Sequence, residues 1–301
     1  MLRIGERDIK ISGRLVRVAS LEGDKYCFLN DHEPVSITEG LRKCSTRADI
    51  FTFVQRVTET SPKHPYPWEW DNFAALPIST FDHWWTKQLG FKARNKAKQA
   101  EKKGATLREM PFDEFLVRGI WTIYNECPIR QGKRFPHYGM SVERVRDYAA
   151  TFLDRSVFIG AFVGDTLIGF AKLTIDETQT QAGLMHIVSM VQHRDKAPTN
   201  ALIAQAVRSC AEREIPYLIY SNFAYGNKQH DTLSDFKERN GFRRIEIPRY
   251  YIPLTWIGAS ALRLGMHRQL MDRLPEAWIA KLRKFRSSWY ARKMQSSPET
   301  N

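Results

Sequence analysis

The sequence has 301 residues, of which 43% are hydrophobic and 26% charged, so we expect a globular protein with one large domain or two small ones. No apolar run approaches the ~20 residues that a membrane-spanning helix needs, and the first residues lack the apolar segment of a signal peptide. A cytoplasmic protein is therefore expected.

The formal net charge is +13, and two segments carry it. Residues 84–104 hold seven Lys and Arg against one Glu, and residues 263–293 hold nine against one Asp and one Glu. Such concentrated charge predicts a polyanionic partner, such as tRNA or an acidic carrier protein, or an anionic membrane face. The alternative for each segment is a solvated helix face.

The four cysteines are Cys27, Cys44, Cys127 and Cys210, and no two of them have C-x-x-C spacing. This pattern disfavours both a structural zinc site and a disulfide framework. We expect free thiols and no metal.

Residues 1–83 predict a small β-rich extension. Strand-like runs occur at 10–20, 24–30 and 48–57. The segment 61–77, SPKHPYPWEWDNFAALP, contains four prolines and is expected to be an aromatic and proline-rich connector, because proline excludes a regular helix.

The basic segment 84–104 is free of β-branched residues apart from Thr86, and it is expected to form a helix that ends at Gly104. The order of elements after it is clear. Apolar periodicity and turn signals predict a strand at 105–110, helices at 112–127 and 141–153, a hairpin at 156–176, a strand at 184–191, a helix at 197–214, a strand at 216–223, a helix at 231–240 and a strand at 242–254.

The predicted order β-α-α-β-β-β-α-β-α-β resembles that of the GNAT acyltransferases. The segment FKERNGF, residues 236–242, is similar to the L-Y-x-x-x-G-F ending of that family, and Asn222 closes the preceding strand, as an asparagine often does there. The resemblance implies an α/β fold, a GNAT-like mixed sheet flanked by helices, over residues 84–254. Residues 1–83 and the C-terminal helical extension, 255–301, lie outside it.

Two departures narrow the resemblance. GNAT enzymes usually carry Q/R-x-x-G-x-G/A after the fourth strand, whereas this chain has HRDKAPTNAL, and they favour tyrosine where this chain has Lys237. Both departures are similar to the FemAB-like branch, with its F-K-x-x-x-G ending. That branch implies transfer of an acyl or aminoacyl group.

The loop before the helix at 197–214 is the expected donor site. A helix that starts with proline presents free N–H groups and a partial positive charge, which favour a phosphate. The predicted cofactor-binding residues are Arg194, Lys196, Ala197, Thr199 and Asn200. The alternative is a plain capped helix.

The predicted catalytic residues are Lys237, Tyr225, His186 and Asn222. The resemblance implies that Lys237 stabilises the oxyanion or the leaving group, and Tyr225 is a second proton donor. His186 is a plausible base, because an imidazole is neutral near physiological pH. Lys237, Tyr225 and His186 also have structural interpretations, as a solvated lysine, a structural tyrosine and a core histidine.

The connection between the first two helices of the predicted fold often covers the acceptor in GNAT enzymes. We therefore predict that Glu126, Arg130, His137 and Tyr138 bind substrate, with the planar fork of Arg130 on a carboxylate or phosphate. The alternative is an ordinary surface loop.

Beyond the fold, apolar residues recur at helical spacing over 274–293 among basic residues. This basic amphipathic helix is expected either to dock on its own domain or to lie on a membrane surface, peripheral to the inner membrane face.

Together these features predict an N-acyltransferase that uses acyl-CoA or acetyl-CoA and a small-molecule, glycan or peptide amine acceptor. The alternatives are an aminoacyl-tRNA-dependent FemAB-type transferase, a transferase served by an acyl-carrier protein, and a catalytically idle GNAT-fold protein that binds RNA or a membrane.

Overall fold

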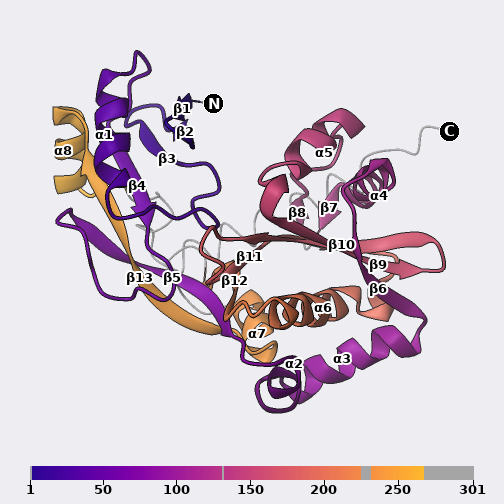
Figure 1. Cartoon of the computed structure of the whole chain (residues 1–301). Helices are drawn as coiled ribbons and strands as arrows, with labels where there is room; N and C mark the ends of the chain where they lie inside the picture. The colour runs from indigo at the N-terminus through magenta and orange to yellow at the C-terminus, as the bar shows by residue number, and fades with distance from the viewer. Residues whose placement is uncertain (1, 131, 225–231, 268–301) are drawn as a thin grey trace. The chain divides into compact units, whose positions relative to one another are not determined.

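The computed structural model describes residues 2–130, 132–224 and 232–267 (Figure 1). The chain forms two compact units, each discontinuous in sequence. Unit 1 comprises Met1–Gly90, Leu173–Met185 and Val207–Gln269, and unit 2 comprises Phe91–Lys172, His186–Ala206 and the terminal segment Leu270–Asn301, which lies outside the described residues.

The predicted order of elements over 104–254 is confirmed. The elements are β6 (Ala105–Met110), α4 (Glu114–Asn125), α5 (Val142–Ala149), β9 (Ser156–Val163), β10 (Thr166–Ile175), β11 (Ala182–Ser189), α6 (Pro198–Glu212), β12 (Tyr217–Asn222), α7 (Thr232–Arg239) and β13 (Arg243–Pro253). A short hairpin, β7 (Ile129–Arg130) and β8 (Lys133–Arg134), lies in the α4–α5 connection and was not predicted.

The remaining strands are β1 (Leu2–Ile4), β2 (Arg7–Ser12), β3 (Val18–Leu21), β4 (Ile50–Val54) and β5 (Trp68–Pro77). The mixed sheet has the strand order β1-β2-β3-β4-β13-β5-β12-β11-β10-β9-β6. Strands from 1–83 therefore hydrogen-bond directly to strands of the predicted transferase fold.

The prediction that residues 61–77 form only a connector is wrong at its second half. Residues 68–77 form β5, which pairs antiparallel with β12 on one side and with β13 on the other. The positions of the prolines explain why a connector was predicted and why a strand can still form, because three of them precede the strand and Pro77 ends it. The interior run from Phe73 to Leu76 is fully buried, so sheet packing decides the conformation.

The prediction of a strand at 24–30 is also wrong. This segment is a turn followed by irregular chain, and it leads into α1 (Glu33–Lys43). It packs tightly on the sheet, since a methyl group added to Gly183 of β11 would lie 2.0 Å from the Tyr26 ring. A segment that crosses a sheet cannot also join its ladder, which is why its apolar side chains do not make it a strand.

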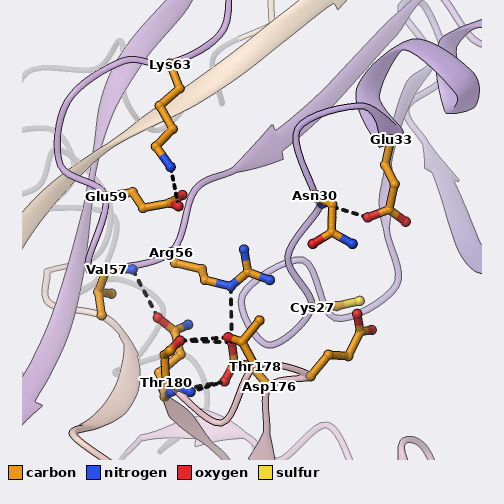
Figure 2. Close-up of polar contacts among 12 residues, drawn as sticks. Cys27, Asn30, Glu33, Arg56, Val57, Glu59, Lys63, Asp176, Thr178 and Thr180 are labelled. Atoms are coloured by element: carbon orange, nitrogen blue, oxygen red, sulfur yellow. Dashed lines mark hydrogen bonds and ion pairs between the residues drawn. The ribbon is translucent and has the colours of Figure 1, made fainter.

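The turn between β10 and β11 is fixed to the chain after β4 by polar contacts (Figure 2). The Asp176 carboxylate accepts hydrogen bonds from Arg56, Thr178 and Thr180, and the side chain of Gln181 accepts one from the Val57 N–H at 3.0 Å. These contacts lower the pKa of Asp176 although its burial alone would raise it.

In unit 2, α4 and α5 lie on one face of β9 and β10, and α3 (Phe91–Lys102) lies on the opposite side (Figure 1). Buried Leu116, Ile120 and Tyr124 of α4 pack with Phe158 and Phe170 of the strands. Ser141 caps α5 as predicted, because its hydroxyl accepts a hydrogen bond from the Arg144 N–H.

The predicted basic helix is divided in two. A π-helical turn, Trp84–Gln88, ends at Leu89, and α3 then begins at Phe91. The break falls at Gly90. A Cβ atom at this position would lie 3.0 Å from the Arg239 carbonyl oxygen, so the close approach of the two backbones favours glycine. The predicted end at Gly104 agrees with the structure, because this glycine has φ +77°.

All four cysteines are free, as predicted. Among the described residues, no helix is long and apolar enough to span a membrane. The amphipathic segment 274–293 lies outside the described residues, so the membrane-facing role stays a prediction.

Candidate active site

In unit 1, the polar groups of the predicted site gather at the end of β12. The strand carries a bulge between Ile219 and Asn222, and Ser221 has a positive φ of 50°, a conformation that a residue with a side chain seldom adopts. The side-chain amide of Asn222 donates to Asp71 Oδ1 at 3.0 Å and to the Asn72 carbonyl at 3.1 Å. Residue 222 is thus held rigidly by β5.

Lys25 is a functional candidate that the sequence did not reveal. Its Nζ donates to the side-chain oxygen of Asn222 and to Ser221 Oγ at 3.2 Å. Burial lowers the pKa of Lys25, and the charge of Arg249 acts in the same direction against the opposing effect of Asp24. Lys25 lies in the extension, 197 residues from Asn222, and no spacing rule joins positions so far apart.

Two carboxylates balance the cations at this end of β12. Arg249 of β13 donates to Asp71 at 2.9 Å and to Asp24 at 2.8 Å. These carboxylates raise the pKa of Arg249 against the effect of its burial. Asp71 bonds to both Asn222 and Arg249, so it couples the ion pairs to the strand end.

Lys237 is buried, with none of its surface exposed. Its Nζ donates to the backbone carbonyl of Asn222 and to that of Phe223 at 3.4 Å, and it lies 4.9 Å from the centre of the Tyr220 ring. The solvated-lysine interpretation is therefore wrong. Two ammonium groups, those of Lys25 and Lys237, contact the same residue, Asn222.

Tyr225, the second predicted proton donor, lies outside the described residues, so its role stays a prediction. The other predicted residues belong to unit 2.

His186 of β11 and His137 of the α4–α5 connection lie in one aromatic cluster. Their ring centres are 6.4 Å apart, and both rings contact Tyr148, at 4.9 Å and 5.1 Å. Burial, followed by the charges of Lys172 and His137, lowers the pKa of His186 to about 3. Burial also lowers the pKa of His137.

A base with a pKa near 3 holds a proton in only about one molecule in 10⁴ at pH 7, so it is a weak proton acceptor. This low pKa favours a hydrogen-bonding role for His186 over proton abstraction. Its predicted role as the base therefore requires a change of environment.

The loop after β11 holds a carboxylate of the chain itself. Glu126 accepts hydrogen bonds from the backbone N–H of Val191 at 2.7 Å and of Gln192 at 2.9 Å. Two consecutive N–H groups at the end of a strand form an anion site of the kind that a phosphate takes. Here the side chain of Glu126 fills it.

Arg130 completes this arrangement. Its guanidinium donates to Glu126 at 3.2 Å and to the carbonyls of Ser189 at 2.6 Å and Ile123 at 2.5 Å, and it stacks 4.6 Å from the centre of the Phe135 ring. Burial lowers the pKa of Arg130. Tyr138 is 43% exposed, so the structure does not gather it with the buried members of the predicted acceptor site.

The predicted donor loop forms a single 3-10 turn, Arg194–Lys196, followed by Ala197 with φ 51° and by Pro198 at the start of α6. Asp195 accepts a hydrogen bond from Lys103 at 3.1 Å, and the hydroxyl of Thr199 contacts that of Ser189 at 3.0 Å.

The α3 helix buries a stripe of small residues, Ala93, Ala97 and Ala100, and exposes most of its cations. The exposed lysines are Lys92, Lys96, Lys98 and Lys102. In the described part of the chain, no group of three or more His, Cys, Asp or Glu side chains is arranged to hold a metal ion.

No family model and no curated protein sequence matches the chain. Solved structures do match its fold. The C-terminal domain of a protein assigned as a lysylphosphatidylglycerol synthetase from Agrobacterium fabrum has a TM-score of 0.55 at 12% identity, covering 84% of this chain and 83% of that chain. L-PGS from Bacillus licheniformis has a TM-score of 0.54 at 12% identity, with the same coverage. FemX has a TM-score of 0.52 at 9% identity, covering 82% of this chain and 86% of that chain.

The chain therefore has the GNAT-type, FemAB-like fold that the order of its elements predicted. Identities this low carry the fold alone.

Proposed function

We propose that this protein is an aminoacyltransferase that takes its donor group from a polyanionic carrier, aminoacyl-tRNA. The observation that carries the chemistry is the convergence of Lys25 and Lys237 on Asn222 at the end of β12. Acyl transfer builds negative charge on the carbonyl oxygen and on the leaving group, and buried cations stabilise such charge more than exposed ones do.

In this proposal Lys25 donates a hydrogen bond to the developing oxyanion, and Lys237 is a positioning residue. Asn222 and Ser221 orient the Lys25 ammonium by accepting hydrogen bonds from it. Lys237 fixes the backbone of Asn222 by donating a hydrogen bond to the Asn222 carbonyl oxygen. Asp71 of β5 accepts a hydrogen bond from the Asn222 amide, so β5 anchors the residues that orient the Lys25 ammonium.

Two observations favour tRNA over acyl-CoA, the donor expected from the sequence. Glu126 occupies the two N–H groups after β11, and its charge repels a pyrophosphate there. Exposed lysines on α3 provide the dispersed positive charge that a nucleic-acid backbone takes. The neighbour named as a lysylphosphatidylglycerol synthetase adds support, because its name describes an aminoacylated product.

Acyl-CoA is the second candidate, and the start of α6 favours it. Ala197 in the left-handed conformation followed by Pro198 opens a 15-residue helix directly after Lys196. Thr199 and Asn200 lie in its first turn, where backbone N–H groups favour a phosphate.

The test measures the affinity for a fluorescently labelled tRNA that carries a stable amide-linked aminoacyl group, at several salt concentrations. One variant changes Lys92, Lys96, Lys98 and Lys102 of α3 to Gln. The matched control changes four exposed cations of unit 1, Lys10, Arg14, Arg42 and Lys43, to Gln. Each lost phosphate contact flattens the log–log salt slope by about 0.7–0.9, so the α3 variant is expected to flatten it by about three.

The control is expected to keep the slope of the parent protein. Equal slopes in all three proteins would refute the proposed donor. Calorimetric binding of acetyl-CoA, with loss of affinity on Lys196→Glu, would then establish the second candidate.

A further inference from the structure

The imidazole pair, His137 and His186, contains two buried nitrogen atoms that have no hydrogen-bond partner among the described residues. They are Nδ1 of His137 and Nε2 of His186. The two rings lie 6.4 Å apart, edge to face, and Tyr148 contacts both. They come from different elements, since His186 is on β11 and His137 is in the connection before α5.

Such atoms are costly in a folded protein. A buried polar group that lacks its partner costs about 1–3 kcal/mol, and native structures contain few of them. Two in one cluster indicate that a bound group supplies the missing partners. Arg130 Nε, beside Glu126, is a further buried atom of this kind.

The charges around the imidazole pair indicate whether the bound group is a cation or an anion. Among the described residues, no carboxylate contributes to the pKa of either imidazole, and the charges that lower the pKa of His186 are those of Lys172 and, after it, His137. Burial lowers the pKa of Lys172 to about 8, so it stays largely protonated at neutral pH. The exposed cations Lys133 and Arg134 precede His137 by four and three residues. This surrounding disfavours a cation and favours an anion.

We propose that the imidazole pair binds an oxyanion of the transfer acceptor, a phosphate or a carboxylate, through N–H groups at His137 Nδ1 and His186 Nε2. Neutral imidazole carries one N–H, and the tautomers with the proton on these atoms make both nitrogens hydrogen-bond donors. The assignment of this oxyanion to the transfer acceptor rests on the proposed function, whereas the oxyanion site itself does not.

Tyr148 controls access to this site. It is the exposed member of the cluster, with 37% of its surface exposed, and its ring covers both imidazoles. Its backbone is held in place, because Lys172 donates to the carbonyl of Ala149 at 2.8 Å and to Thr151 at the end of α5. We therefore expect the ligand to enter by rotation of the Tyr148 side chain.

The test is NMR of the full chain with ¹⁵N-labelled histidine, titrated with inorganic phosphate, glycerol 3-phosphate, acetate and glycerol. His137 and His186 are expected to shift together and saturably with phosphate or acetate, while the exposed His32 and His83 stay unchanged. His186→Phe is expected to weaken phosphate binding at least about tenfold, the effect of losing one hydrogen bond to a charged group. Tyr148→Ala, which removes the cover, is expected to strengthen it.

Saturation by glycerol instead of an anion would overturn the proposal, and so would shifts no larger than those of His32 and His83. A stronger response to glycerol 3-phosphate than to acetate would support it and assign a phosphate. If the protein binds phosphate at this site but binds neither tRNA nor acetyl-CoA, the oxyanion site is supported and the proposed function is refuted.

Discussion

Replacement of Lys237 separates its structural role from a chemical one. The buried ammonium donates to the carbonyls of Asn222 and Phe223, and its aliphatic stem is fully covered. Lys237→Met keeps most of the stem and removes the ammonium, so the Asn222 carbonyl loses a charged donor, whereas the Phe223 carbonyl keeps the Ser234 hydroxyl at 3.2 Å. Loss of a hydrogen bond from a buried charged group costs about 1–3 kcal/mol, offset in part because the ammonium no longer needs to be desolvated.

We therefore expect Lys237→Met to lower the free energy of unfolding by about 2 kcal/mol. Lys237→Ala also removes three buried methylenes at about 0.8 kcal/mol each, so its total loss is expected to be about 4 kcal/mol. The assay is urea unfolding followed by tryptophan fluorescence. The matched control is Lys87→Met, a change at an exposed lysine of the π-helical turn, which is expected to lie within about 0.5 kcal/mol of the parent.

A Lys237→Met protein as stable as the Lys87→Met control would refute the structural reasoning. If that protein also lost kcat and kcat/KM equally, with donor affinity retained, Lys237 would act on the transition state, as the sequence predicted.

Two further predictions concern other buried bases. Lys25→Met is expected to lower kcat and kcat/KM together by about 10²–10³-fold, as loss of one oxyanion donor does, and a rise in KM alone would make Lys25 a binding residue. The pKa of His186 is about 3 in the folded protein and 6.5 ordinarily, so the unfolded chain binds more protons between these values and the protein loses stability as pH falls from 6.5 towards 3. His186→Phe is expected to reduce this loss, measured as urea midpoints at pH 7 and pH 4, and an unchanged loss would show that His186 is not buried as described.

The sequence determined the local order of the elements. Proline at the start of α6, Ser141 before α5 and Gly104 after α3 act through their own backbone neighbours, so short-range rules place them correctly. The periodicity of the apolar residues then predicted the order of strands and helices over 104–254, and with it the fold.

Only the tertiary structure decided which polar groups meet. Lys25 reaches Asn222 across 197 residues, and Glu126 reaches the N–H groups of Val191 and Gln192 across 65 and 66 residues. The tertiary structure also decided that residues 68–77 form β5, because they pair with β12 and β13 in spite of the proline-rich segment before them. Local sequence signals act over a few residues, whereas the burial and pairing of these groups depend on which strands become neighbours, and that is a property of the whole sheet.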